Sequence, residues 1–229
     1  MSVPRTARAR ARAEITREIT DAARRQLAES GAPALSLRAI ARELGMVSSA
    51  LYRYFPSRDE LLTTLIIDAY NALGDAVDAA VDAAGTPRAQ WRAISNAVRQ
   101  WATEHPHEYA LIYGSPVPGY QAPESTIGPA SRAGIAALTI VHRAWESGQL
   151  VEPDDSLTPE LAAQSAAIAT VIAPGLPQVV VARVFIAFTQ LFGAVTFELF
   201  GQLNNSMDPA GPFFAYAVDT LADLIGLPA

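Results

Sequence analysis

The stretch SLRAIARELGMVSSALYRYFPSRDE, residues 36–60, contains two very short amphipathic segments joined by a tight turn. The first segment spaces its apolar residues with the period of a helix that begins after the N-cap Ser36 and ends at Gly45. In the second segment, Leu51 and Phe55 are four residues apart and therefore share one face of a helix. Two short helices around a glycine turn are typical of a helix-turn-helix, whose second helix enters the major groove of DNA.

Burial divides the side chains of the second segment into two groups. If Leu51 and Phe55 face a core, the remaining side chains point away from it. These outward residues are Ser48, Ser49, Tyr52, Arg53 and Tyr54. They offer hydroxyl groups, flat rings and one cation, which suit phosphate groups and base edges. The alternative is an ordinary pair of packed helices in which the two tyrosines are partly buried.

The flanking sequence predicts two longer helices around this pair. An apolar stripe through Ile19 and Leu27 predicts a first helix, which Gly31 can end in a left-handed conformation. After the pair, Ser57 and Glu60 form a capping box that starts a long helix. We therefore expect a first helix that braces the short pair and a long helix that leads away from it.

Charge is distributed unevenly along the chain. The net charge is −6, but residues 1–58 hold 11 arginines against five acidic residues. Residues 59–229 hold six arginines against 18 acidic residues, so a basic head precedes an acidic body. This asymmetry is expected where only one end of a protein meets phosphates. We expect residues 1–12 to be a flexible, arginine-rich arm, and the alternative is a disordered tail without a function.

Composition and motifs argue against an enzyme. The sequence has no cysteine, which excludes thiolate metal sites and cysteine nucleophiles. It has no lysine either, which excludes Schiff-base chemistry and the lysine of a P-loop. His105 and His107 lack the i, i+4 spacing of a helical zinc site. We therefore expect no catalytic residue, no metal and no cofactor.

The remainder of the chain repeats helical patterns, so we predict an all-α fold with about nine helices. Further helices are predicted from Thr86 to near Pro106, over 108–113, over 130–147, from Thr158, over 178–200 and over 213–225, with a loop over 114–129. The most apolar region, residues 179–200, is interrupted by Arg183, Gln190 and Glu198. We read it as a buried helix and not a membrane span, and we expect a cytoplasmic protein.

The two short segments closely resemble the signature of the TetR family of transcriptional regulators. The likeness is carried by LRAIARELG at residues 37–45 and by ALYRYFPSRDEL at residues 50–61. It implies a DNA-binding domain at residues 1–58 and a helical ligand-binding and dimerisation domain at residues 59–229. It also implies a homodimer that binds a palindromic operator in double-stranded DNA and is released by a small-molecule effector.

The resemblance assigns roles to individual residues by their position. Ser36 and Arg38 are the implied phosphate contacts, and Tyr52 and Tyr54 are the implied pair that contacts phosphates and bases. Ser48, Ser49 and Arg53 would contact base edges or backbone, and Arg58 is a further implied DNA-binding residue. Arg58 stands where the family usually has lysine, and Tyr54 stands where histidine is common. Val47 replaces a frequent serine or threonine, so we expect Ser48 to cap the recognition helix instead.

The body of the chain carries a second likeness and a candidate dimer interface. The segment YALIYGSPVPGY, residues 109–120, resembles a segment of one TetR subgroup with a characteristic C-terminal domain. The two most apolar late segments, residues 178–200 and 213–225, are candidates for the self-complementary patch of a homodimer. The alternative is that both segments only fill the core of one chain.

Large aromatic residues in the body predict a pocket for an apolar or aromatic effector. The candidate ligand-binding residues are Trp101, Tyr109, Tyr113, His142, Trp145, Phe188 and Phe192, with Thr189 and Gln190 as polar partners. Each aromatic residue is equally compatible with a place in the core. We expect the ligand to favour a form in which the two DNA-binding heads are wrongly spaced, with the helix after Ser57 as the lever.

A rival reading is a helical partner-binding or membrane-surface protein anchored by the basic arm.

Overall fold

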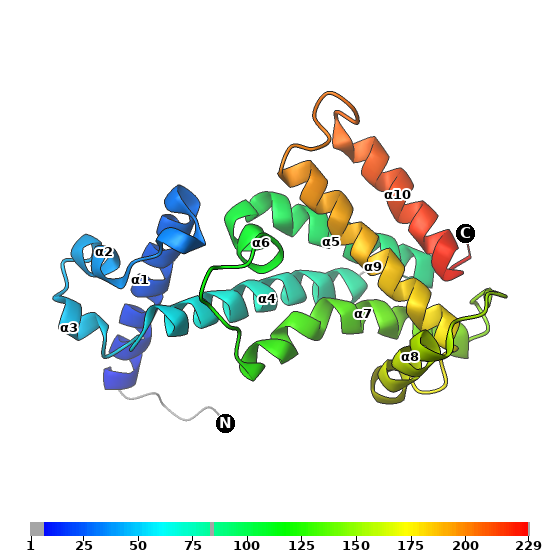
Figure 1. Ribbon diagram of the computed structural model, residues 1–229, viewed down its shortest axis with the longest axis horizontal. Helices are drawn as coiled ribbons and strands as arrows, with labels where there is room; N and C mark the ends of the chain where they lie inside the picture. The colour runs from blue at the N-terminus through cyan, green and yellow to red at the C-terminus, as the bar shows by residue number, and fades with distance from the viewer. Residues whose placement is uncertain (1–6, 83–84, 229) are drawn as a thin grey trace. The chain divides into compact units, whose positions relative to one another are not determined.

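The structure, a computed structural model, describes residues 7–82 and 85–228 (Figure 1). Over these ranges the chain forms ten α-helices and two short 3-10 helices, without a strand, so the predicted all-α fold is confirmed. The elements are α1 (Ala7–Ser30), η1 (Ala32–Ala34), α2 (Leu37–Glu43), α3 (Ser48–Leu51), α4 (Arg58–Asp82), α5 (Pro87–Glu104), α6 (Pro106–Tyr113), η2 (Glu124–Thr126), α7 (Ile127–Glu146), α8 (Pro159–Ile172), α9 (Gln178–Leu199) and α10 (Ala210–Ile225).

The chain divides into two compact units. The first contains the chain up to Tyr70 together with residues 105–127, and the second contains residues 71–104 and the chain from Gly128 onwards. This division differs from the boundary predicted at residue 58, because α4 is one continuous helix and α6 packs against α1. The assignment of DNA binding to the head and of ligand binding to the body stays a prediction.

The first unit is built around side chains from α1, α2, α3 and the start of α4. Its buried apolar residues include Ile19, Leu27, Leu37, Ile40, Leu51, Phe55, Leu61, Leu62 and Leu65. Burying each of these side chains stabilises the fold by about 1.5–3 kcal/mol. Gly31 ends α1 with a φ of 73°, as the sequence predicted. The short helices are therefore held by a shared core and not by their own length.

The N-terminal arm differs from the prediction. Residues 7–12 are helical and belong to α1, so the flexible arm expected over residues 1–12 is wrong for this part. The physical reason is that alanine and arginine, which alternate in this stretch, are among the strongest helix formers. Residues 1–6 lie outside the described residues.

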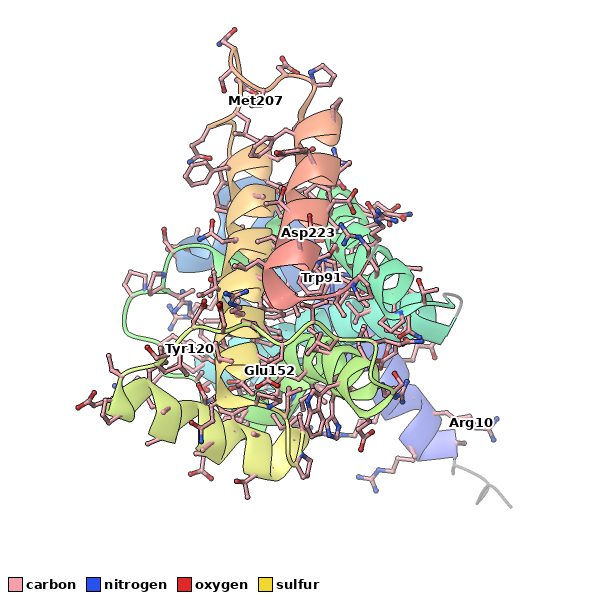
Figure 2. All side chains as sticks on the ribbon, turned by 90° about the vertical axis from the view of Figure 1, so that its right-hand side faces the viewer. Arg10, Trp91, Tyr120, Glu152, Met207 and Asp223 are labelled. Carbon is pink, nitrogen blue, oxygen red and sulfur yellow. The ribbon has the colours of Figure 1, made fainter. Side chains whose placement is uncertain are left out.

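The second unit packs α9 against α5, α8 and α10. The indole Nε1 of Trp91 on α5 donates to the carbonyl of Val218 on α10 at 2.9 Å (Figure 2). At the end of α10, the Arg88 guanidinium donates to the Asp223 carboxylate at 2.6 Å and to the carbonyl of Leu227 at 2.9 Å. These bonds join α5 to α10 at two points along α10. They also give a hydrogen-bond donor to a backbone carbonyl that follows the end of α10.

By length and composition, α9 is apolar enough to cross a membrane. Half of its apolar window is nevertheless buried within the fold, against α5, α8 and α10. This is the behaviour of a core helix, which passes the same test of hydropathy. The other half of the window is not buried within the fold.

Helices α7 and α10 begin three residues earlier than the sequence indicated, and α6 begins two residues earlier, at Pro106. α7 begins at Ile127 instead of residue 130, and α10 begins at Ala210 instead of residue 213. In α7 and α10 a proline that marks a loop in the sequence, Pro129 or Pro212, is the third residue of the helix. The N–H groups of the first turn have no acceptor within the helix, so proline costs no hydrogen bond there.

Candidate nucleic-acid interface

The turn before α3 is fixed by hydrogen bonds at both ends of α2. The hydroxyl of Ser36 accepts from the amide of Ala39 at 3.4 Å, which confirms the predicted N-cap. At the other end, Gly45 has a φ of 65°, and the amide of Met46 donates to the carbonyl of Ala41 at 2.8 Å. This pattern is a Schellman motif, in which a glycine takes the left-handed conformation at low cost.

The recognition helix is shorter than its pattern predicted. α3 covers Ser48–Leu51, whereas a helix over residues 48–55 was expected. Beyond Leu51 the backbone tightens, because Arg53 and Tyr54 donate to the carbonyls three residues earlier. Pro56 contributes to this early end, because proline has no N–H to donate to the carbonyl of Tyr52 and its ring would clash with that carbonyl in a continued helix. Val47 is the N-cap residue and Ser48 lies inside the helix, so the expected cap by Ser48 is wrong.

The side chains of this segment separate into an inner and an outer group. Leu51 and Phe55 are buried in the core of the first unit. Ser48, Ser49 and Arg53 are exposed, and Tyr52 keeps 41% of its surface in contact with solvent. Tyr54 differs from the expectation, because it is half-buried and packs against the core. The exposed group therefore presents hydroxyls, one ring and one cation on a single surface.

Arg12 contacts this surface, although the sequence pattern gave no sign of it. Its guanidinium lies over the ring of Tyr54, 4.9 Å from the ring centre, and donates to the carbonyl of Arg53 at 3.3 Å. A cation over an aromatic face contributes about 0.5–1 kcal/mol at an exposed site. The alanine and arginine repeat could have predicted that Arg12 belongs to α1. It could not have predicted that Arg12 lies beside the segment after α3.

Arg58, an implied DNA-binding residue, has hydrogen-bond partners within the first unit. Its guanidinium donates to the carbonyls of Ala32, Pro33 and Leu35, at 2.8, 3.3 and 3.2 Å. It therefore anchors the linker between α1 and α2 to the start of α4. Of the implied phosphate contacts, Arg38 is exposed and Ser36 is half-buried at its cap.

An ion-pair network joins three helices of the first unit. Arg24 on α1 pairs with Asp21 at 2.9 Å, with Asp68 on α4 at 2.9 Å and with Glu108 on α6 at 3.2 Å. Burial raises the pKa of the Asp68 carboxyl, and the charge of Arg24 partly opposes this shift. Arg25 separately pairs with Glu43 of α2 at 2.6 Å. One guanidinium thus compensates three carboxylates that would otherwise repel one another.

The seven predicted effector residues are divided between the two units. Tyr109 and Tyr113 lie in the first unit, where their rings are 5.2 Å apart and Tyr70 meets Tyr113 edge-on at 5.9 Å. Tyr109 is fully buried, and burial raises the pKa of Tyr113. The other five residues belong to the second unit, where Trp101 and Phe192 are buried.

His142 and Trp145 contact the turn between α8 and α9. The Nε2 atom of His142 lies 3.0 Å from the carbonyl oxygen of Pro174. The rings of His142 and Trp145 stack with their centres 6.2 Å apart. A Cβ atom on Gly175 would lie 3.4 Å from the Trp145 ring. These two side chains therefore support the turn, while Phe188 pairs with Phe192 at 4.7 Å on α9.

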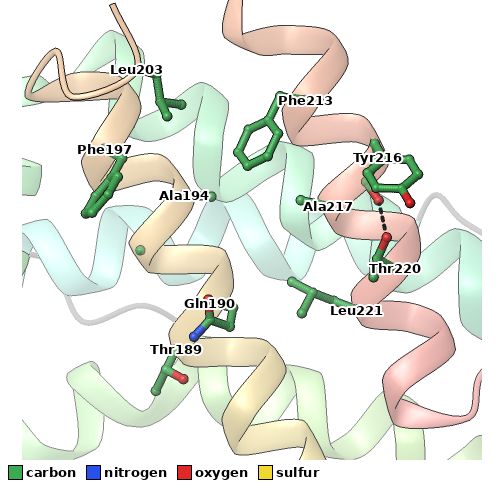
Figure 3. Close-up of a pocket in the computed structure, with 11 residues that line it drawn as sticks. Thr189, Gln190, Ala194, Phe197, Leu203, Phe213, Tyr216, Ala217, Thr220 and Leu221 are labelled. Atoms are coloured by element: carbon green, nitrogen blue, oxygen red, sulfur yellow. Dashed lines mark hydrogen bonds between the residues drawn. The ribbon is translucent and has the colours of Figure 1, made fainter. Parts of the chain in front are cut away.

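A groove of about 610 Å³ runs between the outer faces of α9 and α10 (Figure 3). It is lined by Thr189, Gln190, Gly193, Ala194, Phe197, Leu203, Phe213, Tyr216, Ala217, Thr220 and Leu221. None of these lining residues carries a charge. Figure 3 shows Phe213 pointing from α10 towards α9 across the groove. Thr189 and Gln190, expected beside the effector, thus belong to this outer surface.

Comparison with known proteins identifies relatives over nearly the whole chain. The family model described as "Bacterial regulatory proteins, tetR family" matches residues 19–65, and that described as "Tetracyclin repressor-like, C-terminal domain" matches residues 91–221. The HTH-type transcriptional regulator Rv1816 of Mycobacterium tuberculosis is 43% identical over 213 residues, which are 90% of each chain.

Solved structures agree with this result. The crystal structure of the protein SCO4313 is 32% identical, with a TM-score of 0.76 over 96% of this chain and 100% of that chain. PfmR, a TetR family transcriptional regulator of Thermus thermophilus, shares the fold at 21% identity, with a TM-score of 0.61 over 92% of this chain and 99% of that chain.

Proposed function

The chain belongs to the TetR family of bacterial transcriptional regulators, and we propose that it represses transcription as a homodimer that binds a palindromic operator and is released by a small apolar effector. Its relatives are regulators and not enzymes. The observation that carries the proposal is the exposed surface of α3 and the turn after it, where Ser48, Ser49, Tyr52 and Arg53 lie on a segment anchored by Leu51. A repressor acts on the chromosome, so we place the protein in the cytoplasm.

The chemistry of the α3 surface supports its role in reading DNA. Arg53 and the hydroxyls of Ser48 and Ser49 can donate to phosphate oxygens and base edges, and Tyr52 adds a ring and a further hydroxyl. Since α3 is only four residues long, few base pairs can be read by one head. A second head therefore extends the site, which favours a palindrome with half-sites about 34–36 Å apart.

The groove between α9 and α10 supports the homodimer. Phe197 is 53% exposed and Tyr216 is 72% exposed, which is unusual for large apolar surfaces that stay in water. Gly193, Ala194 and Ala217 are small, so they allow a partner helix to approach closely. A two-fold dimer places the same patch of both copies face to face. We propose that α9 and α10 of two copies form a four-helix bundle here.

We propose α4 as the lever between effector and DNA. At its N-terminal end, Arg58 is bonded to the linker before α2. In its C-terminal half, Asp75 and Asp78 pair with Arg132 of α7 at 2.7 and 2.6 Å. A ligand that favours one arrangement of α7 would thereby bias α4, and operator affinity would fall by that differential affinity.

The test is the selection of bound fragments from a random DNA library, followed by footprinting and determination of the number of chains per site. We expect an inverted repeat bound by an even number of chains, and derepression of a reporter when the gene is deleted. An asymmetric single site bound by one chain would contradict the homodimer, and a fall in reporter expression on deletion of the gene would contradict repression. Arg132→Ala tests the lever: it should bind operator and ligand but lose release.

A further inference from the structure

A separate cavity of about 240 Å³ lies between α7, α8 and α9 in the second unit. Its walls are Ala130, Ser131, Gly134, Ile135, Leu138, Ile172, Val184, Phe185 and Phe188. Of the residues expected from the sequence to hold an effector, Phe188 is one of these walls. The cavity therefore shares one residue with the predicted effector set, and its own residues define what it can hold.

Small side chains on α7 create this space. Ala130, Ser131 and Gly134 face the phenylalanines of α9, and a Cβ atom on Gly134 would lie 3.9 Å from the Cζ atom of Phe188. That distance is an ordinary van der Waals contact, so the backbone does not require glycine there. Glycine inside a helix is unfavourable relative to alanine. Gly134 instead leaves space in the cavity that it lines together with Phe188.

The lining decides the chemistry of the occupant. None of the described residues in the walls carries a charge, and Ser131 supplies the one side-chain hydroxyl. Ile135 and Phe185 remain 41% and 45% exposed at the cavity, so a bound apolar molecule would remove large hydrophobic surfaces from water. An ionised ligand would lose its hydration without gaining a counter-ion.

The volume limits the size of the occupant. An apolar cavity of about 150 Å³ holds benzene, and pockets for drug-sized ligands have about 300–1,000 Å³. The cavity of about 240 Å³ lies between these values and matches a molecule of one or two fused rings.

The cavity and the α9–α10 groove use different sides of α9. Phe188 lines the cavity and Phe197 lines the groove, and the two residues are nine positions apart. At 3.6 residues per turn this separation is two and a half turns, which places them on opposite faces. A second copy seated on the groove therefore leaves the cavity available to a small molecule.

Resting on the proposed function, we infer that this cavity is the effector site and that it selects a small, uncharged, aromatic or alicyclic molecule. The ligand occupies the space that is lined by Gly134 of α7 and by the rings of Phe185 and Phe188 on α9. Arg132, on the same helix as Gly134, connects the site to α4. Occupation of the cavity thus acts on the helix that we propose as the lever.

The test measures binding of naphthalene to the full chain by calorimetry, with 2-naphthoate as its charged counterpart. We expect saturable binding of one naphthalene per chain and at least about tenfold weaker binding of 2-naphthoate. Gly134→Leu fills the cavity, so it should weaken naphthalene binding at least about tenfold. Gly128→Leu is the matched control, because Gly128 is on the same helix with no atom near its Cβ position, and it should bind as the parent does.

Unchanged naphthalene binding in Gly134→Leu, or equally tight binding of 2-naphthoate, would overturn the inference. If Gly134→Leu does not fold, Gly134→Ala adds only the Cβ atom and should still weaken binding about threefold, in proportion to the smaller volume that it fills. Operator affinity is measured separately with and without saturating naphthalene, and a fall of about 5- to 150-fold is expected. Binding without a change in operator affinity would overturn the assignment of the cavity as the effector site, while its preference for an uncharged aromatic ligand would stand.

Discussion

The surface of α3 and the groove between α9 and α10 both present an exposed tyrosine, but the surroundings of the two rings are opposite. Tyr52 stands beside Arg53 and two serine hydroxyls. Tyr216 stands beside Phe213, Ala217 and other uncharged residues of the groove. Exposure alone therefore does not identify the partner of an aromatic side chain. The neighbouring charges do, because phosphate requires cations and donors, whereas a protein partner requires apolar area and close approach.

The strongest test of this comparison places a charge in the groove. Ala217→Asp should prevent dimer formation, since an unpaired carboxylate buried in an interface costs about 3–5 kcal/mol, or more than 100-fold in the dimer dissociation constant. Ala215→Asp is the matched control, because Ala215 is exposed on the same helix and is not part of the groove lining. Sedimentation equilibrium measures both. A dimer of Ala217→Asp as stable as that of the control would show that the groove is not the interface.

Exchanging the same substitution between the two tyrosines sharpens the comparison. Tyr52→Ala should weaken operator binding about 10- to 100-fold, as expected for the loss of one groove contact per head, without changing the dimer. Tyr216→Ala should weaken the dimer and leave operator affinity unchanged at protein concentrations that saturate dimerisation. Fluorescence anisotropy with labelled operator and sedimentation give the two readouts. The comparison fails if both variants alter the same readout.

The sequence predicted most of this architecture because caps and periodicity are local properties. Ser36, Ser57 and Thr158 cap helices as expected, and Gly31 and Gly45 end them with positive φ. Contacts between distant segments carry no such local signal. Periodicity shows that a face is buried but not what covers it, which explains why the predicted effector residues fall into two units.

The same limit applies to the candidate interface. The outward positions of Tyr52 and Arg53 follow from the burial of Leu51 and Phe55. The half-buried Tyr54 packs against the core and contacts Arg12, which is 42 residues away in the chain. Arg58 similarly binds carbonyls of a linker whose path the sequence did not define. Residues that act through long-range contacts were therefore missed or given a different role.

Removing Arg24 tests how much its ion pairs, which join α1, α4 and α6, contribute to stability. Arg24→Ala should lower the free energy of unfolding by about 1–2 kcal/mol at neutral pH. This loss is smaller than for a fully buried ion pair, because Arg24 and Asp68 are both partly exposed. Burial already raises the pKa of Asp68, and losing Arg24 raises it further. A raised acidic pKa means that stability falls as pH rises from the ordinary value near 3.8 through the folded value, so the deficit should shrink towards acid pH.

Urea unfolding at pH 7.5 and pH 4 measures this dependence. Arg25→Ala serves as the control, because the pair between Arg25 and Glu43 is more exposed and should contribute at most about 0.5 kcal/mol. An Arg24→Ala deficit that is equal at both pH values would mean that the three carboxylates do not repel one another.

The smallest expected effect concerns Arg12. Arg12→Ala should weaken operator binding about three- to fivefold, corresponding to the loss of one exposed cation–ring contact. If Arg12 acts by holding Tyr54, Arg12→Ala should add nothing in a Tyr54→Ala background, and the salt dependence of binding should stay unchanged. Arg10→Ala is the control, because Arg10 is also an exposed arginine on α1. Additive losses with a reduced salt slope would instead make Arg12 a phosphate contact.

The brevity of α3 has an evolutionary consequence. Its four helical residues are held by Leu51, Phe55 and the neighbouring turns, so the outer positions contribute little to the core. Ser48, Ser49, Tyr52 and Arg53 can consequently mutate with little penalty in folding. A gene duplicate could acquire a new operator by drift at four codons while its scaffold persists, and a library randomised at these codons should yield mostly soluble, folded proteins.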